Sequence, residues 1–149
     1  MVNVVIAIKR ILYLLLKLAG MSQKRIQIDP QTVLNFWAPS QSNTKNQKNT
    51  TPKPVLLLLH GFCGDGILTW LFQVLYLSKT YAVHVPDLLF FGDSITAWPE
   101  RSTAFPAECL AKGLKILGVE KCTCVGFSYG LFVGFNWLKC TRSWLMQWL

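Results

Sequence analysis

The pentapeptide Gly126-Phe127-Ser128-Tyr129-Gly130 is the feature that most constrains how this 149-residue chain can fold. It fits the pattern G-x-S-x-G and directly follows an apolar, strand-like segment at residues 122–125. Where a strand turns sharply into a helix at such a sequence, the central serine has strained backbone geometry and an exposed hydroxyl. The glycines at positions 126 and 130 let neighbouring backbone pass closely. Ser128 is therefore the candidate nucleophile.

A second motif, His60-Gly61-Phe62, ends the apolar segment 55–59. A loop that follows a buried strand can supply backbone N–H groups to a developing oxyanion. A serine, however, is a weak nucleophile unless a histidine takes its proton and a carboxylate orients that histidine. No Asp, Glu or His follows Ser128, and the chain has only two histidines, His60 and His84. We interpret His60 as a residue that braces its loop and His84 as a core residue of a strand.

Most of the net charge lies outside the part of the chain that carries the two motifs. The chain is 52% hydrophobic and 15% charged, with a net charge of +8. Residues 1–53 hold eight of the 15 Lys and Arg residues against the single acid Asp29, whereas the remaining residues are nearly neutral. The high pI is therefore no argument for a nucleic-acid partner. The five cysteines are odd in number and lack C-x-x-C spacing, so nothing demands an oxidising compartment. We also expect no metal and no cofactor.

The pattern of apolar residues divides the chain into segments. Residues 2–20 form an amphipathic helix with the polar residues on one side, which favours a helix packed on protein or lying in a membrane interface over a signal or an anchor. Alternation predicts a hairpin from residues 25–28 and 32–37, followed by a polar loop at 39–54. Strands are then expected at 55–59, 81–85 and 122–126, with helices at 67–77, 106–117 and from about residue 129. Alternating strands and helices predict an α/β fold with a mostly parallel sheet and helices on both faces.

By these motifs the chain resembles a plant family of α/β-hydrolase-fold proteins, described as epoxide-hydrolase-like or 2-hydroxymuconate-semialdehyde-hydrolase-like. The resembling segments are residues 60–66, 86–94 and 117–122 together with the pentapeptide, and the likeness extends from Met1 to Phe135. The resemblance implies that Ser128 is the nucleophile and that the backbone N–H groups of Phe62 and Tyr129 form the oxyanion hole. His60, Gly61, Gly126 and Gly130 are then structural parts of the motifs, and the substrate is a small carbonyl compound.

Two features set the chain apart within that resemblance. Epoxide hydrolases of this fold carry Asp at the nucleophile position, so a serine indicates ester or carbon–carbon bond hydrolysis instead. Asp87 and Asp93 precede Ser128, on the wrong side in sequence for the triad acid of this fold, and are interpreted as structural acids of a loop.

The last segment, residues 136–149, bears no relation to the family. Codons chosen to fit it can be read in another frame as Leu-Ala-Glu-Met-Tyr-Pro-Glu-Leu-Val, which is similar to the family's own helix. We therefore expect three regions: an amphipathic leader at 1–22, a partial hydrolase domain at 23–135 truncated after the nucleophile turn, and a frame-shifted tail.

The sequence thus predicts a truncated serine hydrolase that is inactive as it stands, cytoplasmic or peripheral at a membrane surface through residues 1–20. The alternative is a non-catalytic half-domain that binds a membrane or a partner. A third reading, a dyad of Ser128 with His60, would predict reaction with a fluorophosphonate.

Overall fold

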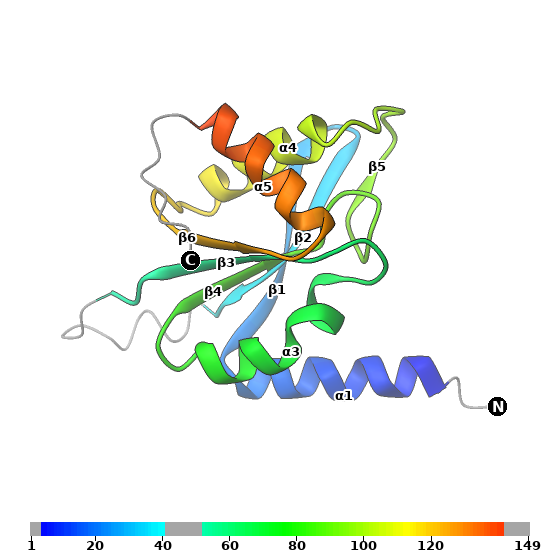
Figure 1. The fold of residues 1–149 in the computed structure, drawn as a ribbon. Coiled ribbons are helices and arrows are strands. Elements are labelled where there is room, and N and C mark those ends of the chain that lie inside the picture. The colour runs from blue at the N-terminus through cyan, green and yellow to red at the C-terminus, as the bar shows by residue number, and fades with distance from the viewer. Residues whose placement is uncertain (1–3, 41–51, 142–149) are drawn as a thin grey trace.

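The computed structural model of the chain describes residues 4–40 and 52–141, shown in Figure 1. The hairpin strands β1 (Met21–Asp29) and β2 (Thr32–Pro39) follow helix α1 (Val4–Leu18). The later elements are β3 (Val55–Leu59), α3 (Gly66–Leu77), β4 (Ala82–Pro86), β5 (Ile95–Thr96), α4 (Ala104–Ile116), β6 (Thr123–Gly126) and α5 (Tyr129–Cys140). Most of the polar loop expected at 39–54 lies outside the described residues, as does the tail beyond 141.

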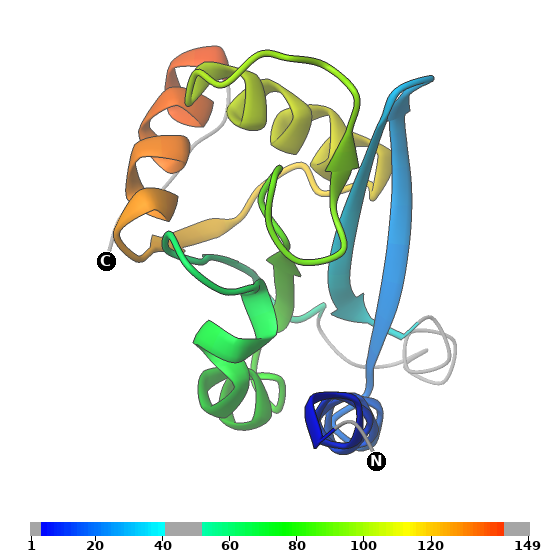
Figure 2. The same cartoon turned by 90° about the vertical axis from the view of Figure 1, so that its right-hand side faces the viewer.

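The strands form one sheet in the order β1-β2-β4-β3-β6, with β5 paired to β2. Strands β4, β3 and β6 are parallel, whereas the hairpin joins them through the antiparallel pair β2 and β4. Parallel strands joined through helices need crossover connections, which α3 and α4 provide. Helices cover both faces: α1 and α3 lie on one, and α4 and α5 on the other (Figures 1 and 2). The expected α/β fold is therefore confirmed.

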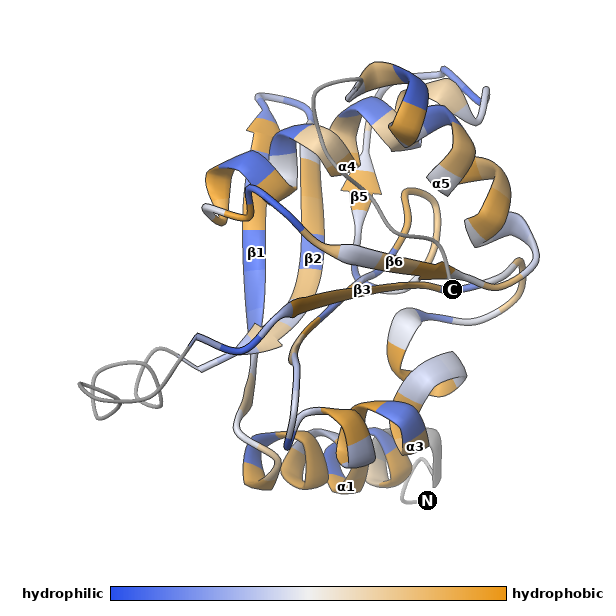
Figure 3. Cartoon of the chain, turned by 60° about the vertical axis from the view of Figure 1, so that its left-hand side comes forward, coloured by the Kyte–Doolittle hydropathy of each residue, from blue (hydrophilic) through white to orange (hydrophobic). Residues whose placement is uncertain are grey.

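Strand β3 has a hydrophobic core on each of its two faces. Leu57 and Leu59 belong to the cluster under α4 and α5, whereas Leu56 and Leu58 belong to the cluster under α1 and α3. Successive strand residues point to opposite faces, so a strand buried on both sides must be apolar throughout. This explains the unbroken Val-Leu-Leu-Leu-Leu sequence, which is uniformly hydrophobic in Figure 3.

Helix α1 is packed on the body of the protein. Leu16 is fully buried against the sheet, and the Tyr13 ring meets Trp37 edge to face with centroids 4.9 Å apart. The Tyr13 hydroxyl also donates to Asp93 at 3.2 Å, and burial together with Asp93 raises the pKa of Tyr13 to about 12. Strand β1 begins at Met21, two residues inside the range assigned to the leader, so the helix leads into the sheet without a linker.

The predicted helices and parallel strands agree with the structure to within a few residues. Gly118 ends α4 with φ 72°, and its amide donates to Lys115, as expected of a glycine that stops a helix. Two elements differ: β1 is longer than predicted, and the two-residue β5 was not predicted. The latter depends on a tertiary contact, a hydrogen bond between the hydroxyls of Thr32 and Thr96.

Helix α5 continues past Phe135 to Cys140, and Trp137 is fully buried in the core. Helix α5 thus crosses positions 135 and 136 without a break, and residues 136–140 are its last part. The assignment of residues 136–149 to a frame-shifted tail stays a prediction, and residues 142–149 lie outside the described part.

Candidate active site

Parallel pairing of β3 with β6 brings the two sequence motifs together. Leu59 is opposite Gly126 in the register, and the Phe127 amide donates to the Leu59 carbonyl at 2.9 Å. The loop that begins at His60 therefore emerges beside the turn that holds Ser128. In open α/β sheets, sites form at the carboxyl ends of the strands, and this is where both motifs lie.

Ser128 has the strained backbone expected of the turn. Its φ is 51° and its ψ is −116°, a combination that non-glycine residues rarely adopt. Within the described residues, Cys63 and Phe90 are the other non-glycine residues with positive φ. All three lie in loops that follow the parallel strands β3, β4 and β6. Strain of this kind costs about 1–3 kcal/mol per residue and concentrates at functional sites.

Glycines make the turn possible because backbone fills the space where a side chain would be. A Cβ at Gly130 would lie 2.5 Å from the Leu59 carbonyl oxygen and 2.6 Å from that of His60. A Cβ at Gly61 would lie 3.2 Å from the Cβ of Ser128 and 2.9 Å from the Phe127 ring. Gly61 and Gly130 are thus required by close approach between the β3 loop and the first turn of α5.

The residues expected to form the oxyanion hole, Phe62 and Tyr129, lie in one aromatic cluster with Phe91. The Phe62 and Tyr129 ring centroids are 6.3 Å apart, and the Phe91 ring is within 5.7 Å of both. Among the described residues, no backbone carbonyl accepts a hydrogen bond from either amide. The amides are thus available at the first turn of α5 and in the loop after β3. Phe91 could not be singled out from the sequence, because its packing against Phe62 and Tyr129 depends on the fold of the loop after β4.

His60 is a structural residue, and the reading of a dyad with Ser128 is not supported by its contacts. Its Nε2 accepts from the Leu88 amide at 2.9 Å, so its Nδ1 carries the proton and donates to the Gly61 carbonyl at 2.8 Å. Burial lowers the pKa of His60, which favours this neutral form. An imidazole with both nitrogens occupied ties the loop after β3 to the loop after β4, and it has no lone pair left for a serine hydroxyl.

His84 and Asp87 are also accounted for by structure. The Nδ1 of His84 hydrogen bonds to the Ala82 carbonyl within its own strand, and burial lowers the His84 pKa. Asp87 is buried and accepts hydrogen bonds from the amides of Gly66 and Asp93 and from the Asn35 side chain. Desolvation raises the pKa of Asp87, partly offset by these bonds. Asp87 therefore links β2, the start of α3 and the loop after β4.

No described residue supplies a base to the serine. Ser128 is exposed, and its side chain makes no capping hydrogen bond at the start of α5. The buried thiols of Cys122 and Cys124 do not act as that base, since burial raises the pKa of both to about 12 and keeps them protonated. The part of the chain that the structure describes also contains no group of three His, Cys, Asp or Glu residues that could hold a metal ion. The arrangement can hold a nucleophile and an oxyanion, and it lacks a proton acceptor.

Comparison with known proteins shows what this arrangement is similar to. The α/β hydrolase fold family matches residues 54–139, more than half of the chain. "Epoxide hydrolase 3" of Siraitia grosvenorii is 38% identical over 92 residues, which cover 58% of this chain and 28% of that protein. The structure of Cfl2 from Burkholderia cenocepacia superposes with a TM-score of 0.73 at 18% identity, covering 87% of this chain and 41% of that one.

An esterase from Thermogutta terrifontis, solved with malate bound, is 26% identical with a TM-score of 0.65, covering 84% of this chain and 44% of that one. The chain thus spans about a quarter of the length of the curated relatives it matches and less than half of the solved structures. The sequence motifs, the sheet topology and the family match all indicate the same fold family. The chain therefore belongs to the α/β hydrolase fold family.

Proposed function

We propose that this chain is the nucleophile-bearing part of a serine hydrolase that acts on a small ester or on a carbon–carbon bond next to a carbonyl. The observation that carries the proposal is the positive φ of Ser128 at the carboxyl end of β6, directly against Gly61. This conformation presents the serine hydroxyl at the carboxyl ends of the parallel strands. The amides of Phe62 and Tyr129, which have no backbone acceptors, lie at the same end.

The proposed chemistry assigns one role to each residue. The Ser128 Oγ attacks the substrate carbonyl carbon, and the carbonyl electron pair moves onto its oxygen. The amides of Phe62 and Tyr129 stabilise that oxyanion, an interaction that typically accounts for about 10²–10³ in rate per donor. The serine proton must pass to a base, and both histidines of this chain already hydrogen bond to the backbone. The base and its orienting acid therefore belong to sequence outside these 149 residues.

The residue type at position 128 also indicates the class of substrate. The curated relative from Siraitia grosvenorii is named an epoxide hydrolase, and epoxide opening in this fold proceeds through a carboxylate at the position that Ser128 occupies here. A serine would form an acyl ester with a carbonyl substrate instead. The likeness to an esterase at 26% identity supports this direction.

The proposal can be tested by joining this chain to a segment that supplies a base and its orienting acid. Residues 1–135 can be fused to the C-terminal half of a serine-dependent family member, from the equivalent helix onward. We expect a fluorophosphonate to label Ser128 in the fusion, and Ser128→Ala to abolish the labelling. A folded fusion whose labelling is unchanged by Ser128→Ala would contradict the role of Ser128.

The second candidate, a non-catalytic half-domain that binds a membrane or partner, is favoured by a specific observation. Large apolar side chains on α1, α3 and α5 are exposed, including Leu18, Phe72 and Phe132. If the fusion described above stays inactive while the native 149-residue product is abundant and stable in cells, the binding function would be preferred.

A further inference from the structure

The face that α1 and α3 turn away from the sheet is apolar, although these helices are on the surface. On α1 the exposed apolar side chains are Ile8, Ile11, Leu14, Leu15 and Leu18, and on α3 they are Leu68, Phe72 and Tyr76. We call these eight residues the outer face. The two helices contact one another, and both are mostly hydrophobic in Figure 3.

The outer face extends beyond the rim of the packed core. At about 100° per residue, Ile8, Ile11, Leu15 and Leu18 fall within one arc of about 80° on α1, and the buried Leu16 lies about 80° from the nearest of them. The apolar side of α1 is therefore wide, and the fold buries only one margin of it. On α3, Leu68, Phe72 and Tyr76 recur every four residues, opposite to the buried Ile67 and Val74. Monomeric proteins rarely leave such contiguous apolar surface uncovered.

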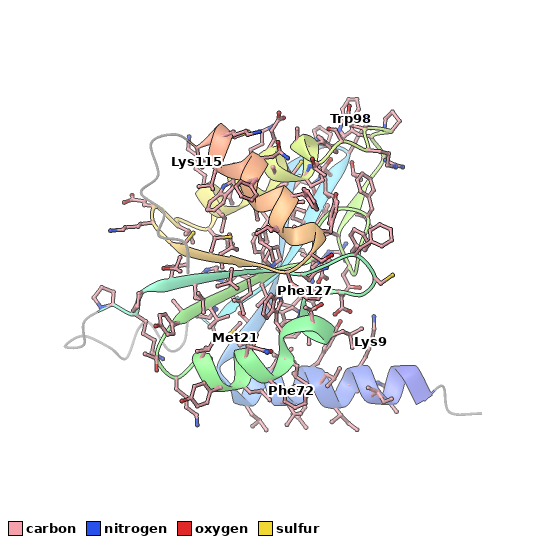
Figure 4. All side chains as sticks on the ribbon, viewed as in Figure 1. Lys9, Met21, Phe72, Trp98, Lys115 and Phe127 are labelled. Atoms are coloured by element: carbon pink, nitrogen blue, oxygen red, sulfur yellow. The ribbon has the colours of Figure 1, made fainter. Side chains whose placement is uncertain are left out.

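The charges around the outer face are mostly basic, although the acidic Asp65 caps the start of α3 and accepts a hydrogen bond from the Leu68 amide. Arg10 and Lys17 are exposed at one border of the apolar arc on α1, and Lys79 is exposed just beyond the end of α3. Neither helix contains an acidic residue. Lys9 extends from α1 on the side of the sheet (Figure 4) and is therefore not part of this border. An apolar stripe with basic residues at its edge complements an anionic lipid surface, where acyl chains and headgroups meet both needs.

We propose that the outer face docks the protein onto anionic lipid bilayers, with α1 and α3 lying in the plane of the interface. Among the described residues, no helix is long and apolar enough to cross a membrane, which agrees with attachment along the surface. Tyr76 is an aromatic residue of the kind enriched at membrane interfaces, and Phe72 is of the apolar kind that interfacial helices bury. The docking requires neither a catalytic base nor Ser128, so it is independent of the proposed hydrolase activity.

Vesicle flotation with the full 149-residue chain tests this directly. We expect binding to phosphatidylcholine vesicles that contain phosphatidylserine, weaker binding to phosphatidylcholine alone, and release at high salt. Ile11→Glu should weaken binding at least about tenfold, because a charge then replaces an inserted side chain. The matched control is Ile116→Glu on α4, since Ile116 is 58% exposed and Ile11 is 59% exposed. This control changes the charge equally on the opposite face of the sheet.

The contribution of charge is tested separately. Arg10→Gln with Lys17→Gln should weaken binding to phosphatidylserine vesicles by about fivefold for each charge removed. Lys115→Gln with Lys121→Gln is the control for net charge and should have a much smaller effect. Circular dichroism checks that each variant keeps its helix content.

Three results would overturn the proposal. The first is equal binding to neutral and anionic vesicles, and the second is equal weakening by Ile11→Glu and Ile116→Glu. The third is a dimer that Ile11→Glu dissociates in the absence of any vesicle binding, which would show that a second copy covers the outer face instead.

Discussion

At the scale of single residues, the turn at Ser128 shows how strain and close packing depend on one another. Ser128 keeps a positive φ because the turn is confined between the β3 loop and the first turn of α5. Gly130 sets that confinement, since only a residue without a side chain lets α5 approach the Leu59 and His60 carbonyls. The candidate nucleophile is therefore positioned by backbone rather than by side-chain contacts.

Gly130→Ala should consequently destabilise the fold more than a surface change does. The added methyl would meet two backbone oxygens that cannot move independently, and overpacking of this kind typically costs about 1–3 kcal/mol. Urea unfolding at low protein concentration, followed by tryptophan fluorescence, measures the loss. Phe132→Ala on the same helix is the control because Phe132 is exposed. Equal midpoints for the two variants would mean that α5 can shift away from β3 freely.

The buried histidines predict a pH dependence of stability. Burial lowers the pKa of both His60 and His84 in the folded state, so the unfolded chain binds more protons just below its ordinary histidine pKa. The contribution of these histidines to the free energy of unfolding should thus have its full value above pH ~6.5 and decrease as the pH drops below that value. Asp87, whose pKa is raised, acts in the opposite direction at lower pH.

Urea midpoints between about pH 7.5 and 5.5 test this, because the histidines dominate that window. His84→Gln should remove part of the dependence and leave the part due to His60. A midpoint independent of pH over this range would show that the two imidazoles are solvated in the folded protein.

At the scale of elements, β6 and α5 leave apolar surface on the side away from β3. Among the described strands, β6 pairs with β3 alone, so its other edge is unpaired. Helix α5 exposes Leu131, Phe132 and Phe135 nearby, next to the exposed Phe127. Unpaired strand edges and apolar patches promote association.

We therefore expect the isolated chain to self-associate at micromolar concentration. Phe132→Glu with Phe135→Glu should shift it toward monomer in size-exclusion chromatography with light scattering. Ile116→Glu, which lies on α4, should have less effect. A monodisperse wild-type monomer that unfolds cooperatively at this concentration would count against the prediction.

At the scale of the whole molecule, the described residues combine the proposed nucleophile and oxyanion donors with no base that hydrogen bonds to the serine. Stabilising an oxyanion and binding substrate leave only a small acceleration over water when the base is lacking. His60 has both ring nitrogens bonded to the backbone, and His84 is a residue of strand β4 whose Nδ1 bonds to the Ala82 carbonyl. No hydrogen bond joins either imidazole to Ser128 among the described residues. Under the proposed function, we therefore expect little Ser128-dependent turnover from the 149-residue chain alone.

The purified 149-residue protein should hydrolyse p-nitrophenyl acetate no faster than its Ser128→Ala variant. The assay is run at several pH values, so that an ionising group other than histidine would be detected. Hydrolysis at ordinary enzyme rates that depends on Ser128 would show that a base is present in the chain after all.

The tail provides a second test at this scale. If residues 136–149 arise from the loss of one nucleotide, independent transcript reads should restore that nucleotide near codon 136. The restored reading frame should then encode the family helix, followed by an acidic residue and a histidine. Reads that keep the present frame, with no such coding sequence in any frame downstream, would show that the tail is genuine. Trp137, buried in α5, would then be a selected core residue.

The sequence by itself determined the alternation of strands and helices, the double-sided burial of β3 and the turn at Ser128. Each of these follows from local periodicity or from glycine spacing, which act within a few residues. Only the tertiary structure decided the tautomer of His60, the cluster around Phe91, the strand β5 and the outer face of α1. These depend on partners far away in sequence: Leu88 for His60, Thr32 for β5 and Trp37 for α1. Helix α1 shows the difference most clearly, since a helical pattern says which side chains are apolar, and only packing selects which of them the protein buries.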